Sequence, residues 1–396
     1  MGVDRCHAPP FLASAVVDGI SLAMPVGQET RLNLAGDLAN RTERCFYTLR
    51  SRPWTRSGCG KGDAVSVWTE EGFEVVHQQF HGQAMPAFES DDMQTHVWGR
   101  RWGVFNDVGT LKVVLMHRPG DELNVVDERL RHPDVPALVD PEARWYFWGE
   151  RAPDLAAMQR GHDALTQVLR EHGVEIVWLD DPRPDDINAM FTRDMMVSLP
   201  GGAIVGRMGP LMRRGQELNV YRTLARIGMP VLRTVAGAGT FEGGGFALLD
   251  ETHAVCAIGH RGNEEGARQV EEVLRPLGIE LLRVPCRGWG CHIDGELVMV
   301  DHKTALIDPT HLPYGFLQQL DALGIRGVHV DPGEGAFAVN CLTLRPGLVV
   351  IAEGNERTRE RLRKVGVDSI AIPYAENHKN GGGIHCSTMP LVRERD

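Results

Sequence analysis

The feature that most constrains the fold is a pattern that occurs five times between Trp102 and the end of the chain. Each copy is a helical stretch that ends at a glycine and is followed directly by a β-rich run, as in "LTQVLREHG-VEIVWL". Glycine suits the position after a helix because it lacks the Cβ that would clash in the left-handed conformation. The spacings of 55, 50, 46 and 42 residues indicate a structural repeat, and the glycines are Gly173, Gly228, Gly278, Gly324 and Gly366.

Two apolar runs joined by a turn precede four of the five helices, and each is typical of a β-hairpin. They are "MMVSLPGGAIVGR", "FALLDETHAVCAIG", "LVMVDHKTALID" and "CLTLRPGLVVIAEG". We place the hairpin of the first copy in "WGVFNDVGTLKVVLMHR", residues 102–118. The repeat is therefore strand, strand, helix, strand, which predicts an α/β fold. Five such units arranged radially would bring their inner strand ends to a common centre.

Composition limits the partners and the compartment. With 42 Lys+Arg against 53 Asp+Glu the chain of 396 residues carries a formal charge of -11, so we expect no nucleic-acid partner and no anionic membrane surface. A small cationic ligand fits this charge. Eight cysteines form no dense paired framework, so we expect reduced thiols and a cytoplasmic location. No stretch approaches the roughly 20 apolar residues of a membrane helix, and the sequence leaves open whether the chain forms a homo-oligomer.

The first hundred residues differ from the rest. They lack sustained periodicity, and "RSRPWTRSGCGKGD" has the composition of a loop. We therefore expect residues 1–100 to be an N-terminal extension of poor order, and residues 101–396 to be the catalytic domain.

Polar segments stand where the hairpins begin, at equivalent places in the repeat. They are "NAMFTRD" (188–194), "FEGGG" (241–245), "CHID" (291–294) and "GGGIHCST" (381–388). Charged groups there are costly to bury without a partner or a ligand, so the four segments indicate one shared site.

Cys386 is the candidate nucleophile of this site. It follows three glycines, which predicts an exposed thiol on a loop that approaches a ligand closely. A thiol is only a few per cent ionised at neutral pH, so attack requires a nearby cation. His292, ahead of His385, is the candidate for the proton transfers, and Glu242 is a candidate for orienting a histidine.

Asp194 and Asp294 add two carboxylates with no obvious lysine or arginine partner beside them in the sequence. Paired carboxylates that face a planar cation form bidentate hydrogen bonds, the geometry that best recognises a guanidinium group. The two-residue spacing of His292 and Asp294 on a strand would put both on one face.

Each residue also has a structural alternative when it is taken alone. Cys386 would be a buried small hydrophobe, His292 a satisfied structural histidine, and Asp294 a turn residue. Cys286, Cys291 and His292 resemble part of a zinc site, but no second Cys-x2-Cys pair completes four ligands, so we expect no metal. Phosphate-binding glycine loops are absent from strand-to-helix junctions, so we expect no cofactor. Cys256 and Cys341 lie in apolar runs and are predicted to be core.

Together the motifs "FTRD", "EGG", "HID" and a glycine-rich "HC" resemble those of the guanidino-group-modifying superfamily, in this order over residues 102–396. Its members include arginine deiminase, dimethylarginine dimethylaminohydrolase and the amidinotransferases, and the resemblance to arginine deiminase looks strongest. It implies the pentein fold, a five-bladed ββαβ propeller with pseudo-fivefold symmetry. It also implies a substrate that carries a guanidino group and a carboxylate.

Residue by residue, the resemblance implies Cys386 as nucleophile, His292 as general acid and base, Glu242 as the partner of that histidine, and Asp194 and Asp294 as ligands of the guanidinium. It further implies three substrate-binding residues. They are Asn188, Arg213 in "LMRRGQE" and Arg261 in "IGHRGNEE", and both arginines are expected to hold the carboxylate.

Three departures from the arginine deiminase pattern leave the substrate open. Gly245 replaces an aspartate in "EGGD", no arginine precedes Cys386 in "NGGGIHC", and the interval between "HRPG" (117–120) and "FTRD" fits only one helix and one strand. The predicted activity is hydrolysis of arginine to citrulline and ammonia through a cysteine amidino-thioether. The alternatives are an amidinotransferase, a dimethylarginine dimethylaminohydrolase, an arginine dihydrolase, or a protein that binds a guanidino compound without turnover.

Overall fold

The computed structural model describes residues 13–17, 20–24 and 68–395, apart from 81, 83, 86, 87, 289 and 336. The chain divides into two compact units, Met1–His81 and Gly82–Asp396. In the first unit, the antiparallel strands β1 (Ala13–Val17) and β2 (Ile20–Met24) and the helix α1 (Glu70–Phe80) are described. The expected poor order of residues 1–100 concerns a region that lies largely outside the described residues. Among those described, no helix is both long and apolar enough to span a membrane.

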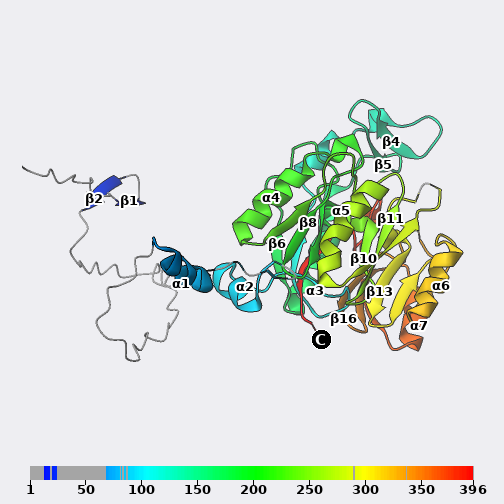
Figure 1. Cartoon of the computed structure of the whole chain (residues 1–396). Helices are drawn as coiled ribbons and strands as arrows, with labels where there is room; N and C mark the ends of the chain where they lie inside the picture. Colours follow the sequence, from blue (N-terminus) through cyan, green and yellow to red (C-terminus); the bar gives the residue numbers. More distant parts are fainter. Residues whose placement is uncertain are drawn as a thin grey trace, which may run out of the picture. The chain divides into compact units, whose positions relative to one another are not determined.

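In the second unit, the described residues form five three-stranded sheets of one design (Figure 1). The first two strands pair antiparallel, and a helix connects the second strand to a parallel third. Four of the sheets contain the predicted hairpins, which confirms those predictions. These sheets are β7 (Met196–Leu199), β8 (Gly202–Val205), α4 (Gln216–Ile227) and β9 (Val231–Thr234); β10 (Phe246–Leu248), β11 (His253–Ile258), α5 (Glu264–Leu274) and β12 (Glu280–Pro285); β13 (Leu297–Asp301), β14 (Thr304–Ile307), α6 (Tyr314–Ala322) and β15 (Arg326–His329); and β16 (Leu342–Arg345), β17 (Leu348–Ala352), α7 (Glu356–Lys364) and β18 (Asp368–Ile372).

The remaining sheet joins the two ends of the second unit. Its middle strand β3 (Leu111–Met116) runs parallel to β6 (Glu175–Trp178) across α3 (Leu155–Glu171), and antiparallel to β19 (Met389–Arg393). The hairpin predicted in residues 102–118 is therefore wrong. Before β3, the Asn106 side chain accepts hydrogen bonds from two following backbone N–H groups, which folds this stretch into a turn, and the C-terminal strand takes the place beside β3.

The five glycines that end the helices confirm the repeat. Their φ angles lie between +70° and +86°, in the left-handed region that the sequence pattern requires. Two shorter helices of the second unit lie outside the repeat, α2 (Asp91–Val97) and α8 (Ala375–His378).

The hydrophobic core is built between neighbouring sheets. One buried cluster joins the β3 sheet to the β7 sheet, and the next three join successive sheets along the chain. A fifth cluster joins the last sheet back to the first, through Val350 of β17 and Val114 of β3. The sheets therefore contact one another in cyclic order. Cys256 and Cys341 are fully buried in these clusters, as predicted.

A hairpin that the sequence did not predict lies between β3 and α3. It consists of β4 (Ala137–Asp140) and β5 (Trp145–Trp148), which pair antiparallel and stand at the top of the molecule in Figure 1. The interval that we assigned one helix and one strand thus holds additional structure. Leu138 and Phe147 of this hairpin pack in the same buried cluster as Cys386, so the hairpin forms one side of the site described next.

Candidate active site

The predicted site residues lie on short turns that lead into the first strand of each hairpin. Asp194 lies in the 3-10 turn Thr192–Met195 before β7, and Glu242 directly precedes the turn Gly243–Gly245 before β10. His292 and Asp294 lie at the turn Ile293–Gly295 before β13, rather than on a strand as predicted. Cys386 comes three residues before β19. A tight turn at this position directs a side chain away from the sheet, so all four segments meet.

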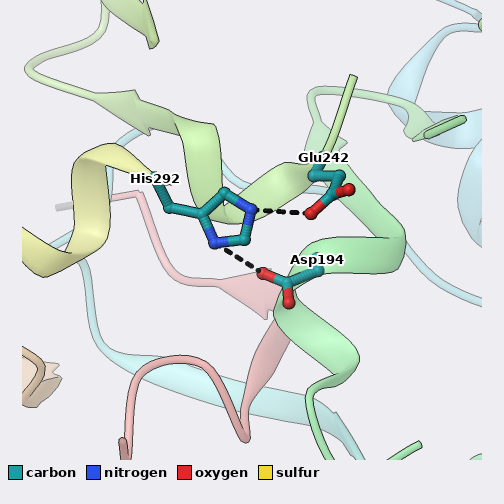
Figure 2. Close-up of side chains that lie close together, drawn as sticks. All are labelled: Asp194, Glu242 and His292. Carbon is teal, nitrogen blue, oxygen red and sulfur yellow. Dashed lines mark hydrogen bonds and ion pairs between the residues drawn. The ribbon is translucent and has the colours of Figure 1, made fainter. Parts of the chain in front are cut away.

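Glu242, His292 and Asp194 form a hydrogen-bonded group (Figure 2). His292 Nε2 donates to Glu242 Oε2 at 2.7 Å, and His292 Nδ1 lies 3.4 Å from Asp194 Oδ1. Burial opposes protonation of this histidine, but the charges of Asp194 and Glu242 outweigh it and raise the pKa of His292. Burial likewise opposes ionisation of Glu242, yet the hydrogen bond from His292 and two nearby arginines lower its pKa. The resting pair is an imidazolium held by a carboxylate.

Glycine is required at position 244 because the backbone passes close to this group. A Cβ there would lie 2.5 Å from Asp194 Oδ1 and 2.7 Å from His292 Nδ1. At Gly245, where the family pattern has an aspartate, the nearest atom to a Cβ is that of Ala257 at 3.6 Å. The departure at Gly245 therefore leaves the positions of Glu242 and His292 unchanged.

Asp194 has an arginine partner that the sequence did not reveal. Arg213 Nη1 lies 2.5 Å from Asp194 Oδ2 and 3.9 Å from Glu242 Oε2, and all three side chains are buried. The prediction that Asp194 has no cationic partner is wrong, because 19 residues of chain fold back to bring Arg213 to it. Asp194 Oδ1 keeps no hydrogen-bond partner although it is buried, so this oxygen faces the site with unused acceptor capacity.

The thiol of Cys386 is buried, with 7% of the residue exposed, whereas the sequence predicted an exposed one. The glycines before it make room for protein side chains: a Cβ at Gly382 would lie 2.5 Å from the Phe191 ring, and one at Gly383 2.5 Å from Asn340 Oδ1. Burial, followed by the negative charges of Asp294 and Asp194, raises the pKa of the Cys386 thiol well above its usual value. The free enzyme therefore holds the thiol in its neutral form, and a bound cation is needed to ionise it.

Asp294 links the thiol to a second histidine. Its Oδ2 accepts from His385 Nδ1 at 2.9 Å and lies 3.4 Å from Cys386 Sγ. Burial opposes ionisation, but the hydrogen bond from His385 and the charge of His292 lower the pKa of Asp294. His385 is thus a partner of Asp294, in agreement with the choice of His292 for the proton transfers.

Asn340 contacts the thiol and was missed by sequence reasoning. Its Nδ2 donates to Cys386 Sγ at 3.2 Å, and its Oδ1 accepts from the Cys386 backbone N–H at 3.1 Å. Asn340 stands two residues before β16, as Asp194 stands two residues before β7. The repeat itself was therefore the signal, because the fifth hairpin also begins with a polar residue.

We expect Asn340→Ala to raise the pKa of the Cys386 thiol, because the variant loses a hydrogen bond that favours the thiolate. A hydrogen bond to a charged group contributes about 1.5–3 kcal/mol, so alkylation by iodoacetamide at a fixed pH below the thiol pKa should slow by about tenfold or more. Asn355→Ala removes an equally buried amide that bonds the Ala352 carbonyl instead, and should leave the rate unchanged. Equal alkylation profiles for Asn340→Ala and the wild type would contradict this role.

A cavity of about 120 Å³ collects the remaining predicted residues around Cys386 and His292. Asn188 lines it and donates to Asn380 Oδ1 at 3.5 Å, and Arg261 lines it 3.4 Å from Glu242 Oε2. Arg144 and Tyr146 of the unpredicted hairpin complete the wall. The structure thus brings all eight predicted residues to one place.

Asp194, Glu242 and His292 each offer an atom within 4.8 Å of the others, which is a spacing that suits a metal ion. Two guanidinium groups already face these carboxylates, since Arg213 and Arg261 both lie within 4 Å of Glu242. A divalent cation would have to displace or tolerate both arginines. The charge balance therefore favours proton chemistry at this group over metal binding.

Comparison with known proteins assigns the family. A family model described as N,N dimethylarginine dimethylhydrolase, eukaryotic, matches residues 152–393, which is more than half of the chain. The chain belongs to this family. The dimethylarginine dimethylaminohydrolase of Pseudomonas aeruginosa is 26% identical over 239 residues, covering 60% of this chain and 89% of that protein. An arginine deiminase of Latilactobacillus sakei is 21% identical over 417 aligned positions, covering 74% and 98% of the two proteins.

A solved structure of the Pseudomonas aeruginosa family member in complex with citrulline matches with a TM-score of 0.57 at 22% identity, covering 72% of this chain and 100% of that chain. The α/β fold with several small sheets is confirmed by this likeness. Membership in the guanidino-group-modifying superfamily, which the motifs predicted, is confirmed by the family match.

Proposed function

We propose that the protein hydrolyses the guanidinium carbon of arginine or a close derivative through a covalent amidino-thioether on Cys386. The observation that carries the proposal is the convergence of Cys386, the His292–Glu242 pair, Asp194 and Asp294 on one cavity. Relatives named as dimethylarginine dimethylaminohydrolase and arginine deiminase support hydrolysis of a guanidino C–N bond.

The reaction begins with binding of the guanidinium between Asp194 Oδ1 and Asp294. The positive charge of the substrate favours the Cys386 thiolate, which attacks the guanidinium carbon and forms a C–S bond. The C–N bond to the leaving amine breaks as His292 gives its proton to that nitrogen. Water then adds to the same carbon and returns a proton to His292, and the C–S bond breaks. The products are a ureido compound and an amine.

The carboxylate of the substrate is held by Arg261 and Arg144, which line the cavity at the end away from Asp294. Sequence comparison assigned Arg213 to the carboxylate as well, but Arg213 is bound to Asp194. We assign Arg213 the role of positioning Asp194 so that one oxygen stays free for the guanidinium.

The arrangement of the sheets fits a five-bladed propeller with the site at its centre. The cyclic order of the core clusters supports this arrangement, since each sheet packs on the one before and the one after it. The turns that carry the site residues all lead into the first strand of a sheet, where a radial arrangement would bring them together.

Mass-spectrometric product analysis with a panel of guanidino compounds tests this function. Arginine, methylated arginines and agmatine are incubated with the full chain, with and without glycine or lysine. A ureido product in all amine conditions supports the hydrolase. Ornithine together with an amidinated glycine or lysine indicates an amidinotransferase, and ornithine with two equivalents of ammonia indicates a dihydrolase. Absence of any product contradicts the proposal.

Arg261→Ala is expected to lower kcat/KM for arginine by about tenfold or more, mainly through KM, because an ion pair to the substrate carboxylate is lost. Agmatine lacks the carboxylate and provides the internal control. Its kcat/KM should change much less, and any change reports the lost contact between Arg261 and Glu242. An equal loss for both substrates would show that Arg261 does not bind the carboxylate.

A further inference from the structure

A second and larger cavity opens beside Cys386. It measures about 730 Å³, and it shares Cys386, His292, Cys291 and Gly381 with the cavity of about 120 Å³ described above. The sulfur therefore lies at the junction of two spaces. The proposed reaction needs the smaller one for the carboxylate end of the substrate, and it leaves the larger one without a role.

The two cavities differ in charge. Arginines line the smaller one, whereas the larger is lined by five carboxylates: Asp294, Glu296, Asp308, Asp331 and Glu334. Asp331 and Glu334 are compensated, because Arg361 lies 2.7 Å from the former and Arg357 lies 3.7 Å from the latter. The three other carboxylates keep an excess of negative charge beside the reacting sulfur.

Glu296 is the centre of this excess. His311 Nδ1 lies 2.9 Å from Asp308 Oδ2 and 3.4 Å from Glu296 Oε2, so one imidazole serves two carboxylates. Burial and the charges of Asp308 and Asp294, opposed by His311, raise the pKa of Glu296 to about 7. Asp294 is 2% exposed and its Oδ1 makes no hydrogen bond within the described residues, while Oδ2 serves His385 and Cys386. A cation in this cavity would compensate both groups.

The position of the cavity indicates what such a cation would be. The leaving amine departs from the carbon attacked by Cys386, and the walls next to that sulfur belong either to the smaller cavity or to this one. Ammonia or dimethylamine needs only a small part of 730 Å³. A larger amine would fit, and a second amino group on it would be protonated at neutral pH and would meet Glu296 and Asp308.

We propose that the larger cavity binds an alkylammonium substituent on a guanidino nitrogen of the substrate, so that the amine released by Cys386 is a diamine. This inference rests on the proposed function and specifies its substrate class: guanidino compounds with a carboxylate at one end and a cationic side arm at the other. Glu296 and Asp308 determine the specificity for the side arm.

Two synthetic substrates of equal length test the proposal with the full chain. Nω-(aminobutyl)-arginine carries the ammonium, and Nω-pentyl-arginine carries a methyl group in its place. We expect kcat/KM, followed by release of the amine, to be about tenfold or more higher for the charged substrate, as one partly buried ion pair allows. Equal values, or a preference for the pentyl substrate, would overturn the proposal.

The Glu296→Gln variant locates the preference. The ratio of kcat/KM for the two substrates should fall by about tenfold, to near one. Glu251→Gln removes a surface carboxylate that pairs with Arg395, and it should keep the wild-type ratio. Asp308→Asn serves the same purpose as Glu296→Gln if the latter fails to fold. A wild-type ratio in a folded Glu296→Gln or Asp308→Asn variant would remove these residues from the site.

Two further arms separate this inference from the proposed function. If arginine and methylated arginines are hydrolysed but neither long substrate is, the function stands and this inference fails. If no guanidino compound is turned over, calorimetric binding of the two long substrates to Cys386→Ser still decides the inference by its charge preference. Transfer of the amidino group from arginine to free diaminobutane, without hydrolysis of the aminobutyl substrate, would show that the cavity receives an acceptor amine and would overturn the assignment.

Discussion

Cys386→Ser is expected to abolish turnover, with kcat reduced by at least about 10⁴-fold, because a serine hydroxyl does not ionise in this site and cannot form the thioether. The change removes one sulfur atom, so the fold and the substrate pocket should persist. Product formation from arginine or a methylated arginine is followed by mass spectrometry, and the adduct is sought on the intact protein. Full ureido product from Cys386→Ser would refute the mechanism.

A second thiol makes the control decisive. Cys291 lines both cavities and is the alternative nucleophile, whereas Cys286 lies outside both. Cys286→Ser should behave as the wild type. If Cys291→Ser lost activity by the factor expected of Cys386→Ser, and Cys386→Ser retained it, the nucleophile would be Cys291.

His292→Ala is expected to lower kcat by about 10²- to 10⁴-fold, the usual contribution of a positioned proton-transfer group. The loss has two parts, because the variant can neither protonate the leaving amine nor activate water. A substrate whose leaving group needs no proton, such as S-methylthiocitrulline, should therefore still form the adduct on Cys386, and the adduct should persist. Intact-protein mass spectrometry measures both its formation and its decay.

The pH profile gives an independent readout for His292. Its pKa is raised, so it is protonated at neutral pH and loses its proton as the pH increases. The wild-type kcat/KM should therefore fall on the alkaline side, and His292→Ala should lack that limb. His253→Gln, a histidine of β11 that pairs with Asp250, should keep the wild-type profile. Rapid hydrolysis of the adduct by His292→Ala would assign water activation to another group.

Local signals in the sequence were sufficient for most of the fold. A glycine that ends a helix acts through its own φ angle, and a hairpin turn pairs strands only a few residues apart, so Gly228 and the β7–β8 hairpin could both be predicted. The partner of β3 could not, because β19 lies at the far end of the chain and nothing near β3 encodes the pairing. The β4–β5 hairpin was missed because its four-residue strands carry little periodicity.

The candidate site was predicted in its membership but not in its internal contacts. The repeat indicated that Asp194, Glu242, His292 and Cys386 occupy equivalent positions, and they do meet in one place. Their charge balance depends on contacts between distant segments, above all the ion pair of Asp194 with Arg213 and the amide of Asn340 on the thiol. Burial of Cys386 also follows from packing of Phe191 and Asn340 on the glycines, which composition alone does not show.

The pairing of β19 with β3 has a consequence for the birth of the protein. Cys386 is only three residues from β19, and that strand is the last element of the chain. The first sheet is therefore incomplete, and the thiol has no fixed place, until synthesis reaches the end. A chain still attached to the ribosome, or one cut shortly before Met389, would display most of the guanidinium-binding residues but no ordered nucleophile. The molecule becomes chemically competent only when its two ends have joined.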